Sequence, residues 1–244
     1  MPSLSVVMPA YLEAENLRLL LPRLKTVLSK EGYQDAEVLV VDTATPLDET
    51  KQVCSECGAN YLARTPGNDF GDAVRTGINA ASGDWILFLD SDGSHPPEFA
   101  VELLKRKQNA DIVIASRYIQ GGYTENSLPL VLMSRMLNWT YGLVLNLKCK
   151  DVSNSFKLYR AELLKELNLT CSNFDIIEEI LFKILRYRPE TRIIEVPFTF
   201  KKRMFGETKR NLLLFISTYI FTMIKLRWSA IRDDRLLKKS EAQN

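Results

Sequence analysis

Two acidic residues spaced two apart, Asp90 and Asp92, carry the clearest chemical signal in this sequence. They follow directly on the apolar run 86–89, and Ser94 lies two positions further along. Because alternate residues of an extended chain point the same way, the two carboxylates can converge on one cation. Such a pair suits Mg²⁺ or Mn²⁺ bridging a diphosphate rather than an enclosed structural metal. The alternative is two solvated turn residues that cap the helix expected after Pro96.

The apolar run before Asp90 is typical of a strand that is buried on both faces of a parallel sheet. Similar runs alternate with helical patterns along the first half of the chain. Strands are expected at 4–8, 37–42, 60–64, 86–89 and 111–116, and helices at 17–28, 47–57 and 72–81. This alternation predicts an α/β fold, in which a mostly parallel central sheet is flanked by helices. Ligands bind such folds at the carboxyl ends of the strands, where Asp90 would lie.

Polar residues also stand at the ends of the first two expected strands. Tyr11 and Glu13 follow the first strand, and Asp42 ends the second. In nucleotide-binding α/β proteins a carboxylate at this edge commonly accepts hydrogen bonds from a base or a ribose hydroxyl. The sequence has neither a Gly-X-Gly-X-X-Gly nor a Walker A motif, so a cation must replace the glycine-rich phosphate cradle. These residues therefore predict a site for a nucleoside diphosphate held by a metal ion.

The second half of the chain supplies basic residues. A long helix is expected at 130–147, a loop that enters a strand at 151–160, and a further strand at 191–200. That strand ends in the basic segment 201–210, whose cations surround one glycine and suit phosphate binding. Some of these cations could instead be solvated loop charges, namely Lys201, Lys202 and Arg210.

Three titratable residues have two open roles each. Glu178 and Glu179 lie on a helix expected at 174–186, where they could pair with an arginine of the site or form part of the exposed helix surface. His95, the only histidine, precedes two prolines, which favours packing at the start of a helix over proton transfer.

The composition is that of an ordinary globular protein. Of the 244 residues, 46% are hydrophobic and 25% are charged. The four cysteines suit a reduced cytosolic chain, and no second pair or histidine cluster accompanies Cys54-X-X-Cys57 to complete a zinc site. The longest apolar stretch, 212–224, is interrupted by polar residues and is short for a membrane span, and no secretory signal is visible.

Charge is distributed unevenly along the chain. Residues 1–200 carry 21 basic against 26 acidic residues, whereas residues 201–244 carry 11 against 4. A basic end beside amphipathic sequence indicates contact with an anionic surface, either membrane or phosphate, and the alternative is a solvated tail. Nucleic-acid binding is not expected, because the basic residues are confined to one short tail. We expect a catalytic domain, 1–210, followed by an amphipathic helix and basic tail, 211–244.

Five short motifs stand in one order at the expected strand ends. They are Pro9-Ala10-Tyr11-Leu12-Glu13, Val41-Asp42, Asp90-Ser91-Asp92, Ser116-Arg117-Tyr118 and Arg203-X-X-Gly206-Glu207-Thr208-Lys209. Over residues 3–210 this set resembles the family-2 glycosyltransferases of GT-A fold, and among them the polyprenyl-phosphate sugar transferases typified by dolichyl-phosphate mannose synthase. The resemblance implies a GT-A-type sheet with a nucleotide-sugar site at the carboxyl ends of its strands.

By this resemblance, the catalytic residues would be Asp90, Asp92 and Arg117, and the alternative for Arg117 is a structural ion pair. The metal ion, Mg²⁺ or Mn²⁺, would be held by Asp90, Asp92 and Ser94. The donor nucleotide sugar would contact a larger set from both halves of the chain. This set comprises Pro9, Tyr11, Glu13, Asp42, Gly71, Arg75, Asp90, Ser91, Asp92, Arg203 and Lys209. The acceptor phosphate would contact Arg117, Ser134 and Arg203.

The sequence departs from the family pattern at three places. Residues 43–45 are Thr-Ala-Thr, where the family usually has a second aspartate and Gly-Ser. Leu130 stands four positions before Ser134, where a basic residue is expected. The segment Asp151-Val-Ser-Asn-Ser-Phe replaces the commoner Asp-Pro-Thr-Ser-Gly-Phe.

The implied reaction is inverting transfer of a sugar, most simply mannose from GDP-mannose, to a polyprenyl or dolichyl phosphate. The acceptor oxygen is already anionic near neutral pH, so no general base is needed, but the leaving diphosphate needs the metal with Arg203 and Lys209 to neutralise its charge. The enzyme would be cytoplasmic and peripheral on the cytoplasmic face of a membrane, bound to the membrane surface or a small membrane subunit. The alternatives are a family-2 transferase with a soluble or protein-linked acceptor, and a non-catalytic subunit that binds a nucleotide sugar.

Overall fold

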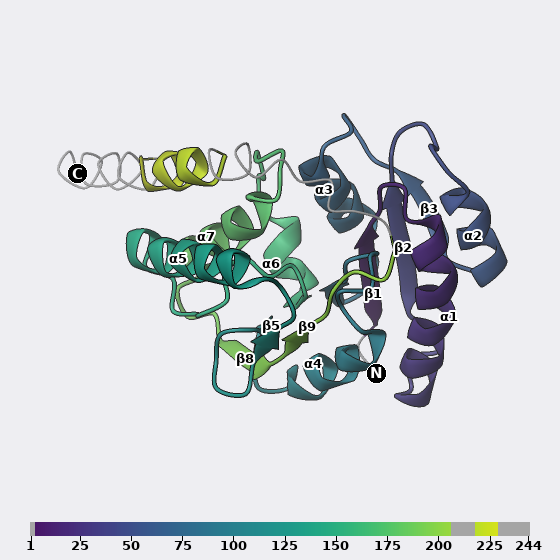
Figure 1. Cartoon of the computed structure of the whole chain (residues 1–244), viewed down its shortest axis with the longest axis horizontal. Helices are drawn as coiled ribbons and strands as arrows, with labels where there is room; N and C mark the ends of the chain where they lie inside the picture. Colours follow the sequence, from purple (N-terminus) through teal and green to yellow (C-terminus); the bar gives the residue numbers. More distant parts are fainter. Residues whose placement is uncertain (1–2, 206–217, 229–244) are drawn as a thin grey trace, which may run out of the picture.

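The computed structural model describes residues 3–205 and 218–228 (Figure 1). The first half of the chain contains β1 (Leu4–Pro9), α1 (Ala14–Lys30), β2 (Glu37–Asp42), α2 (Thr50–Cys57), β3 (Asn60–Ala63), α3 (Phe70–Ala80), β4 (Trp85–Phe88), η1 (Pro97–Phe99), α4 (Ala100–Arg106) and β5 (Ile112–Ser116). The second half contains β6 (Tyr123–Thr124), α5 (Leu128–Leu145), β7 (Lys157–Arg160), α6 (Ala161–Lys165), α7 (Ile176–Tyr187), β8 (Ile193–Pro197) and β9 (Thr199–Phe200). Residues 218–228 form a further helix.

Seven strands form one sheet in the order β3-β2-β1-β4-β7-β5-β8. Neighbouring strands are parallel except at β7, which runs antiparallel to both β4 and β5. The expected architecture, a mostly parallel central sheet flanked by helices, is confirmed (Figure 1). The strand expected at 191–200 is divided, because β8 continues the sheet whereas β9 pairs with β6 in a separate ribbon.

Helices cover both faces of the sheet. One cluster of buried side chains joins the strands to α3, α5, α6 and α7, and a second joins them to α1, α2 and α4. Strand β4, the one that leads to Asp90, is buried along its whole length. Burial from both sides explains why the strands consist of nearly continuous apolar runs, and it leaves the strand ends as the place for polar side chains.

Glu178 and Glu179 lie in the interior of the protein. Both are fully buried on α7, so the expectation of an exposed helix surface is wrong for both. Glu179 accepts hydrogen bonds from the backbone N–H groups of Thr170 and Cys171, and it forms an ion pair of 2.7 Å with Lys183. Its partner is therefore a lysine one turn along the same helix, not an arginine of the site, and its role is to fix the chain that leads into α7.

Helix 218–228 lies next to α5 at the edge of the molecule (Figure 1). Tyr141 of α5 donates a hydrogen bond of 2.7 Å to the carbonyl oxygen of Tyr219, and the two rings meet edge to face with 5.7 Å between centroids. This helix is the described part of the amphipathic segment expected at 211–244, and the rest of that segment lies outside the described residues. Among the helices that are described, none combines the length and the apolar character needed to cross a bilayer.

Candidate functional site

Asp90 follows β4 closely and is held from two sides. Ser155 Oγ donates a hydrogen bond of 2.8 Å to Asp90 Oδ1, and His95 Nε2 lies 3.7 Å from Asp90 Oδ2. The backbone N–H of Asp90 donates to His95 Nδ1 at 3.0 Å. Ser155 fixes the orientation of the Asp90 carboxylate and His95 holds its backbone, while the Asp90 side chain remains 19% exposed and can still meet a ligand.

His95 is a buried packing residue, as its position before two prolines suggests. Its ring stacks on Phe156 with 4.6 Å between centroids. Since Nδ1 accepts the N–H of Asp90, the ring proton is on Nε2, which donates to Asn154 Oδ1 at 3.1 Å. Burial lowers the pKa of His95, and the neighbouring carboxylates Asp90 and Asp92 oppose this effect without reversing it. The ring is therefore neutral at pH 7 and serves to orient Asp90.

Asp92 and Ser94 lie in the tight turn after Asp90. Gly93 adopts a φ of 84°, in the left-handed region that glycine tolerates, and the N–H of Ser94 donates to Asp92 Oδ1 at 3.0 Å. Within the described part of the chain, the buried hydroxyl of Ser94 has no hydrogen-bond partner. A buried oxygen without a partner beside two carboxylates is suited to contact a cation or its ligand.

The chemistry of these oxygens fits a hard divalent cation. Mg²⁺ and Mn²⁺ prefer oxygen ligands, and Mg²⁺ usually keeps several positions for water or substrate phosphates. In residues 3–205 and 218–228 there is no group of three or more His, Cys, Asp or Glu side chains that could hold a metal alone. Asp90, Asp92 and Ser94 therefore fit a cation that is shared with a diphosphate better than an enclosed metal site.

The ends of β1 and β4 are joined at this same edge. Ser91 Oγ donates a hydrogen bond of 2.9 Å to the carbonyl oxygen of Pro9. After β1 the chain turns outward, since Leu12 has a φ of 56° and Tyr11 is 43% exposed. The structure thus brings Pro9, Ser91 and Tyr11 to the acidic edge, with the Tyr11 ring accessible to solvent.

Arg64 organises the neighbouring strand ends and was not predicted as a site residue. Its guanidinium donates to the carbonyl oxygens of Ala10 and Asp42, and Nη1 donates to that of Asn68 at 3.0 Å. Burial lowers the pKa of Arg64, and the charge of Asp42, itself buried at the end of β2, opposes that effect. Arg64 could have been predicted as a site residue from the sequence, because it is a basic residue at the carboxyl end of an expected strand.

The segment 201–205 lies along the turn that carries Asp92 and Ser94. The N–H of Met204 donates to the carbonyl oxygen of Asp92 at 2.9 Å, and the N–H of Lys201 donates to that of Ser94 at 3.1 Å. Arg203 Nη2 forms an ion pair of 2.8 Å with Glu13 Oε1. Arg203 and Glu13 are thereby brought to the acidic edge from opposite ends of the chain.

Lys209, the other cation expected in this segment, lies outside the described residues. Lys201, for which a solvated charge was the alternative, forms an ion pair of 2.8 Å with Glu125, and both side chains are partly exposed. An exposed pair of this kind contributes little to stability.

Arg117, at the end of β5, forms a buried ion pair with Asp151. Nε and Nη2 of Arg117 donate to the two carboxylate oxygens at 2.8 and 2.7 Å, and the backbone N–H of Arg117 donates to Oδ2 at 2.8 Å. Burial alone would lower the pKa of Arg117, but the Asp151 carboxylate outweighs it and raises that pKa above its usual value. Arg117 therefore stays charged, and most of its charge is balanced by Asp151.

Residues 151–156 connect this ion pair to the acidic edge. Asp151 contacts Arg117, whereas Ser155, four residues on, contacts Asp90. Lys157 is buried and donates from Nζ to the carbonyl oxygens of Val152, at 2.9 Å, and Asn154. Burial lowers the pKa of Lys157 to about 8, while the charge of Asp151 opposes this. The sequence predicts a loop here but not that one loop spans both parts of the site.

Ser134 is linked to this loop through Asn138, one turn further along α5. Asn138 Nδ2 donates to the carbonyl oxygen of Ser134 at 2.8 Å and to Ser153 Oγ at 3.0 Å. Asn138 Oδ1 accepts the N–H of Val152 at 2.6 Å. Ser153 Oγ also accepts a hydrogen bond of 2.9 Å from Arg117 Nη2. The structure therefore brings Ser134 and Arg117 into one hydrogen-bonded group.

Arg135 adds a second guanidinium beside this group. The side chains of Arg117 and Arg135 both lie over the ring of Tyr118, at 4.9 and 5.6 Å from its centroid. Unlike Arg117, Arg135 forms no ion pair within the described residues. Arg135 is exposed on α5, so its positive charge is available at this side of the site.

Gly71 and Arg75 have structural contacts away from Asp90 and Asp92. A Cβ atom on Gly71 would lie 2.2 Å from the carbonyl oxygen of Cys171, so only glycine allows this approach. Arg75 Nη1 donates to the same carbonyl oxygen at 2.6 Å, and Nη2 pairs with Asp72 at 2.8 Å. Both residues thus hold α3 against the chain that precedes α7.

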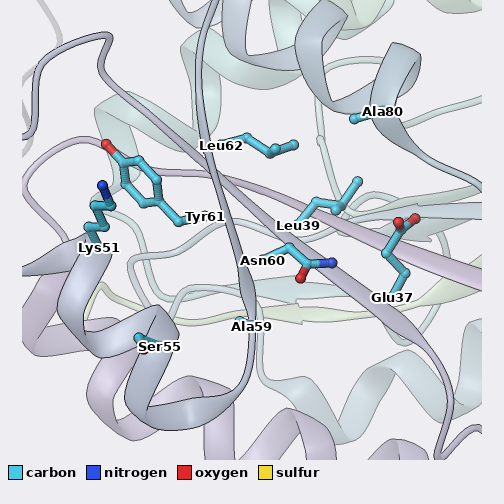
Figure 2. A pocket seen from close by; sticks show the side chains of 9 residues that line it. All are labelled: Glu37, Leu39, Lys51, Ser55, Ala59, Asn60, Tyr61, Leu62 and Ala80. Atoms are coloured by element: carbon cyan, nitrogen blue, oxygen red, sulfur yellow. The ribbon is translucent and has the colours of Figure 1, made fainter.

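A cleft of about 520 Å³ lies elsewhere, beside the edge strand β3 (Figure 2). Figure 2 shows Lys51 and Tyr61 on one side of it and Glu37 on the other. Its lining consists of Glu37, Leu39, Lys51, Ser55, Ala59, Asn60, Tyr61, Leu62 and Ala80. None of the expected site residues lines this cleft, and it carries no converging catalytic groups.

Comparison with protein families gives a match over most of the chain. Residues 5–168 match the family described as "Glycosyl transferase family 2". A dolichol-phosphate mannosyltransferase of Pyrococcus furiosus is 34% identical over 84% of this chain, which spans 58% of that relative's length. An undecaprenyl-phosphate mannosyltransferase of Micrococcus luteus is 31% identical over 84% of this chain and 86% of its own. A dolichol-phosphate mannosyltransferase of Saccharomyces cerevisiae is 28% identical over 84% and 80%.

Solved structures of similar fold include glucosyl-3-phosphoglycerate synthase of Mycobacterium tuberculosis. Its complex with Mn²⁺, UDP and glucosyl-3-phosphoglycerate superposes with a TM-score of 0.68 at 17% identity, covering 93% of this chain and 80% of that one. Its complex with Mg²⁺ and UDP gives a TM-score of 0.70 at 18% identity, with 93% and 79% covered. At this level of identity the likeness establishes the fold alone.

Proposed function

Because the chain belongs to glycosyl transferase family 2 and is a glycosyltransferase of GT-A-like fold, we propose that it transfers mannose from GDP-mannose to a polyprenyl phosphate. The names of the relatives, which act on dolichol phosphate and undecaprenyl phosphate, support the sugar and the acceptor class. The proposed reaction is a direct displacement that inverts the anomeric carbon and depends on Mg²⁺ or Mn²⁺. The proposed location is the cytoplasmic face of a membrane, held by the lipid surface or by a small membrane subunit.

The observation that carries this proposal is the contact between segment 201–205 and the Asp92 turn. The hydrogen bond from Met204 to the carbonyl oxygen of Asp92 places Arg203, the preceding residue, next to the acidic edge. One diphosphate could then contact the cation at Asp90 and Asp92 and the guanidinium of Arg203 together. Because Glu13 already balances part of the Arg203 charge, Lys209 is proposed as the further cation on the diphosphate.

The nucleoside is proposed to lie between the ends of β1 and β2. Pro9 and Tyr11 would contact the base or ribose, while Asp42 and Glu13 supply carboxylates suited to accept from N–H or hydroxyl donors. Arg64 is buried and would not contact the nucleoside itself. It would hold the two strand ends in place by donating hydrogen bonds to both. Gly71 and Arg75 would support the donor site by holding α3 in place. Ser91 would support it by joining the ends of β1 and β4.

Asp90, Asp92 and Ser94 are proposed to hold the metal ion. Mg²⁺ or Mn²⁺, when bound, would neutralise charge that develops on the leaving nucleoside diphosphate. The chain's own contribution is that Ser155 fixes the Asp90 carboxylate while His95 holds the Asp90 backbone N–H, so that the orientation of Asp90 is set before the ligand arrives. The fold neighbours, crystallised with Mn²⁺ or Mg²⁺ and UDP, support this choice of ion.

The acceptor phosphate is proposed to bind between Arg117, Ser134 and Arg203. Asp151 balances the charge of Arg117, so Arg117 would position the phosphate through hydrogen bonds more than through net charge. We add Arg135 to this group, because it is exposed next to Ser134 and shares the Tyr118 ring with Arg117. Arg135 would supply the positive charge for the phosphate that the family's basic residue provides and that Leu130, which stands in its place, lacks.

No general base is proposed. The attacking phosphate oxygen is anionic near neutral pH, so the reaction consists of positioning and charge neutralisation. His95, which is buried, neutral and stacked on Phe156, is unsuited to proton transfer with a substrate.

The test is to incubate the protein with Mg²⁺, a panel of radiolabelled nucleotide sugars and a polyprenyl phosphate. The expected result is organic-extractable label that depends on the polyprenyl phosphate and is greatest with GDP-mannose. If no donor gave lipid-linked sugar, the proposal of a polyprenyl phosphate acceptor would be wrong. If another nucleotide sugar were preferred, the proposal that mannose is transferred from GDP-mannose would be wrong.

A second candidate is transfer to a soluble acceptor. It is favoured by the fold neighbour that was crystallised with phosphoglyceric acid, a water-soluble acceptor. The same experiment distinguishes it, because labelled sugar would then remain in the aqueous phase and require a soluble phosphate compound.

A further inference from the structure

Asn16 is a polar residue in the first turn of α1, and it is only 2% exposed. Its amide Nδ2 donates a hydrogen bond of 2.5 Å to Glu13 Oε2. Its Oδ1 accepts the backbone N–H of Phe205 at 3.1 Å, and Nδ2 also donates to the carbonyl oxygen of Phe205 at 3.4 Å. A buried amide needs such partners, because leaving it unpaired away from water is costly. Asn16 therefore joins the start of α1 to a residue 189 positions later in the chain.

Arg203 is held by the same two partners as Asn16. Arg203 Nε donates to the carbonyl oxygen of Phe205 at 2.8 Å, and Nη2 donates to Glu13 Oε1 at 2.8 Å. Glu13 thus has one carboxylate oxygen on Arg203 and the other on Asn16. The four residues form one closed group of hydrogen bonds, in which each contact fixes the next. A change at Asn16 should therefore alter the direction of the Arg203 guanidinium.

The start of α1 is itself firmly placed. Four leucines of this helix are fully buried, namely Leu17, Leu20, Leu21 and Leu24. Asp48 Oδ2 accepts the backbone N–H of Ala14 at 3.0 Å, which ties the first residue of the helix to the chain before α2. Side chains on packed helices are held more precisely than side chains on loops. Asn16 therefore gives the segment that carries Arg203 a fixed partner.

That segment is also held at the acidic edge, by contacts of another kind. The backbone N–H of Met204 donates to the carbonyl oxygen of Asp92 at 2.9 Å. A Cβ on Gly93 would lie 2.5 Å from Met204 Cγ, so the Met204 side chain lies directly against the turn. These contacts do not involve Asn16 and would remain without its side chain. Loss of the Asn16 contacts should therefore misdirect Arg203 while the segment stays attached to the turn.

We propose that Asn16 is a positioning residue for the donor, which directs the guanidinium of Arg203 at the diphosphate through the backbone of Phe205 and does not touch the substrate itself. The inference rests on the proposed function in one respect, since it takes the diphosphate of a nucleotide sugar as the anion that Arg203 contacts. A guanidinium that is already held in place loses less conformational freedom on binding, so it binds the phosphate more tightly. The role of Asn16 should therefore be visible in the affinity for a nucleoside diphosphate, measured without any acceptor.

The test is calorimetric titration of the full chain with GDP, and separately with UDP, in the presence of Mg²⁺. Asn16→Ala should weaken binding of the preferred nucleotide about tenfold, and Arg203→Ala should weaken it at least as much, because a charge-assisted hydrogen bond is lost or misdirected. The double variant should bind like Arg203→Ala alone, since Asn16 acts through Arg203. Asn109→Ala, at an exposed asparagine after α4, should bind as the unaltered chain does.

The double variant separates a positioning role from a general disturbance of the fold. If Asn16→Ala weakened binding equally with and without the Arg203 side chain, or did not weaken it at all, the inference would be overturned. Phe205→Pro removes the N–H that Asn16 accepts and changes a 40% exposed residue, so it tests the same contact if Asn16→Ala does not fold. It should weaken nucleotide binding too, and unaltered affinity in this variant would also overturn the inference. Thermal unfolding followed by circular dichroism shows whether each variant keeps the fold.

The outcome for Asn16 is separable from the outcome for the proposed function. A chain whose nucleotide affinity depends on Asn16 through Arg203, but which transfers no sugar, would retain this inference and lose the function. A chain that transfers sugar with unaltered nucleotide affinity in Asn16→Ala would retain the function and lose this inference. A chain that binds neither nucleotide would lose both.

Discussion

Asp90 Oδ1 accepts a hydrogen bond of 2.8 Å from Ser155 Oγ, a residue 65 positions later in the chain. The two residues meet because β7 lies antiparallel beside β4, so the start of β7 reaches the edge at which β4 ends. The orientation of the proposed metal ligand therefore depends on the loop before β7.

Replacing Ser155 should weaken metal binding. In Ser155→Ala the Asp90 carboxylate loses one of its fixing contacts, and loss of an outer hydrogen bond of this kind typically lowers metal affinity by about 10- to 100-fold. The measurement is Mn²⁺ binding in the presence of GDP, followed by electron paramagnetic resonance. Ser55→Ala, on α2, serves as the matched control and should bind as the unaltered chain does. Equal affinity in Ser155→Ala would contradict the positioning role.

Asp90→Asn and Asp92→Asn should each abolish sugar transfer without unfolding the protein. Each exchange removes a negative charge from the proposed cation site, and a loss of transfer on the order of 10³-fold is expected from lost metal catalysis. The measurements are lipid-linked product formation and the melting temperature, with Asp35→Asn as an exposed control. Near-full turnover of either variant after chelation of metal would rule out the metal role.

The Arg117–Asp151 pair should be sensitive to the loss of one partner. Asp151→Asn leaves a buried guanidinium without its countercharge, and about 3 kcal/mol or more of the unfolding free energy should be lost. Glu56→Gln, which removes one of the two exposed carboxylate partners of Arg18, should change the unfolding free energy by less than about 1 kcal/mol. Urea unfolding of both variants gives the comparison, and similar small losses would argue against a buried ion pair.

Glu178 should make stability decrease as the pH rises. Burial raises the pKa of Glu178 from an ordinary 4.5 to about 8, while the charge of Lys157 opposes this. Between these values the folded state keeps a proton that the unfolded state releases, so the unfolding free energy falls with rising pH, by at most about 1.4 kcal/mol per unit. Glu178→Gln should lack this loss between pH 5 and 7.5.

Urea unfolding at several pH values measures the difference, with Glu31→Gln, an exposed residue, as the control. If the difference between Glu178→Gln and the unaltered chain were constant across this pH range, Glu178 would not be protonated in the folded state.

Gly71 and Gly142 should respond oppositely to alanine. A Cβ at Gly71 would lie 2.2 Å from the carbonyl oxygen of Cys171, so Gly71→Ala should destabilise the protein by about 1–3 kcal/mol. At Gly142, inside α5, the nearest atom is at 3.6 Å, and Gly142→Ala should stabilise by about 0.5–1 kcal/mol. Thermal unfolding measures both, and a neutral Gly71→Ala would show that the two segments can separate without loss.

The sequence predicted which residues of the candidate site follow strands, and it did not predict the contacts that join them. Asp90 and Asp92 are visible because an apolar run stops at two acids, and Arg64 could have been found in the same way. The contacts of Ser155 and Asn138 are not visible, because they depend on which strands and helices become neighbours. Likewise, apolar periodicity indicates that β7 exists but not that it runs antiparallel between β4 and β5.

The burial of Glu178 and Glu179 was missed for a related reason. Two adjacent glutamates on a helix have the pattern of a solvated surface, and only the tertiary structure brings the backbone donors of Thr170 and Cys171 to Glu179.

The position of β7 has a consequence for biosynthesis. Strands β4 and β5 do not pair with each other, and each pairs with β7 instead. During synthesis β5 leaves the ribosome about forty residues before β7, so until then the growing chain holds a half-built sheet with an open edge at β4. Unpaired edges of this kind favour aggregation, so nascent chains arrested between β5 and β7 should need chaperone protection more than those that extend past β8.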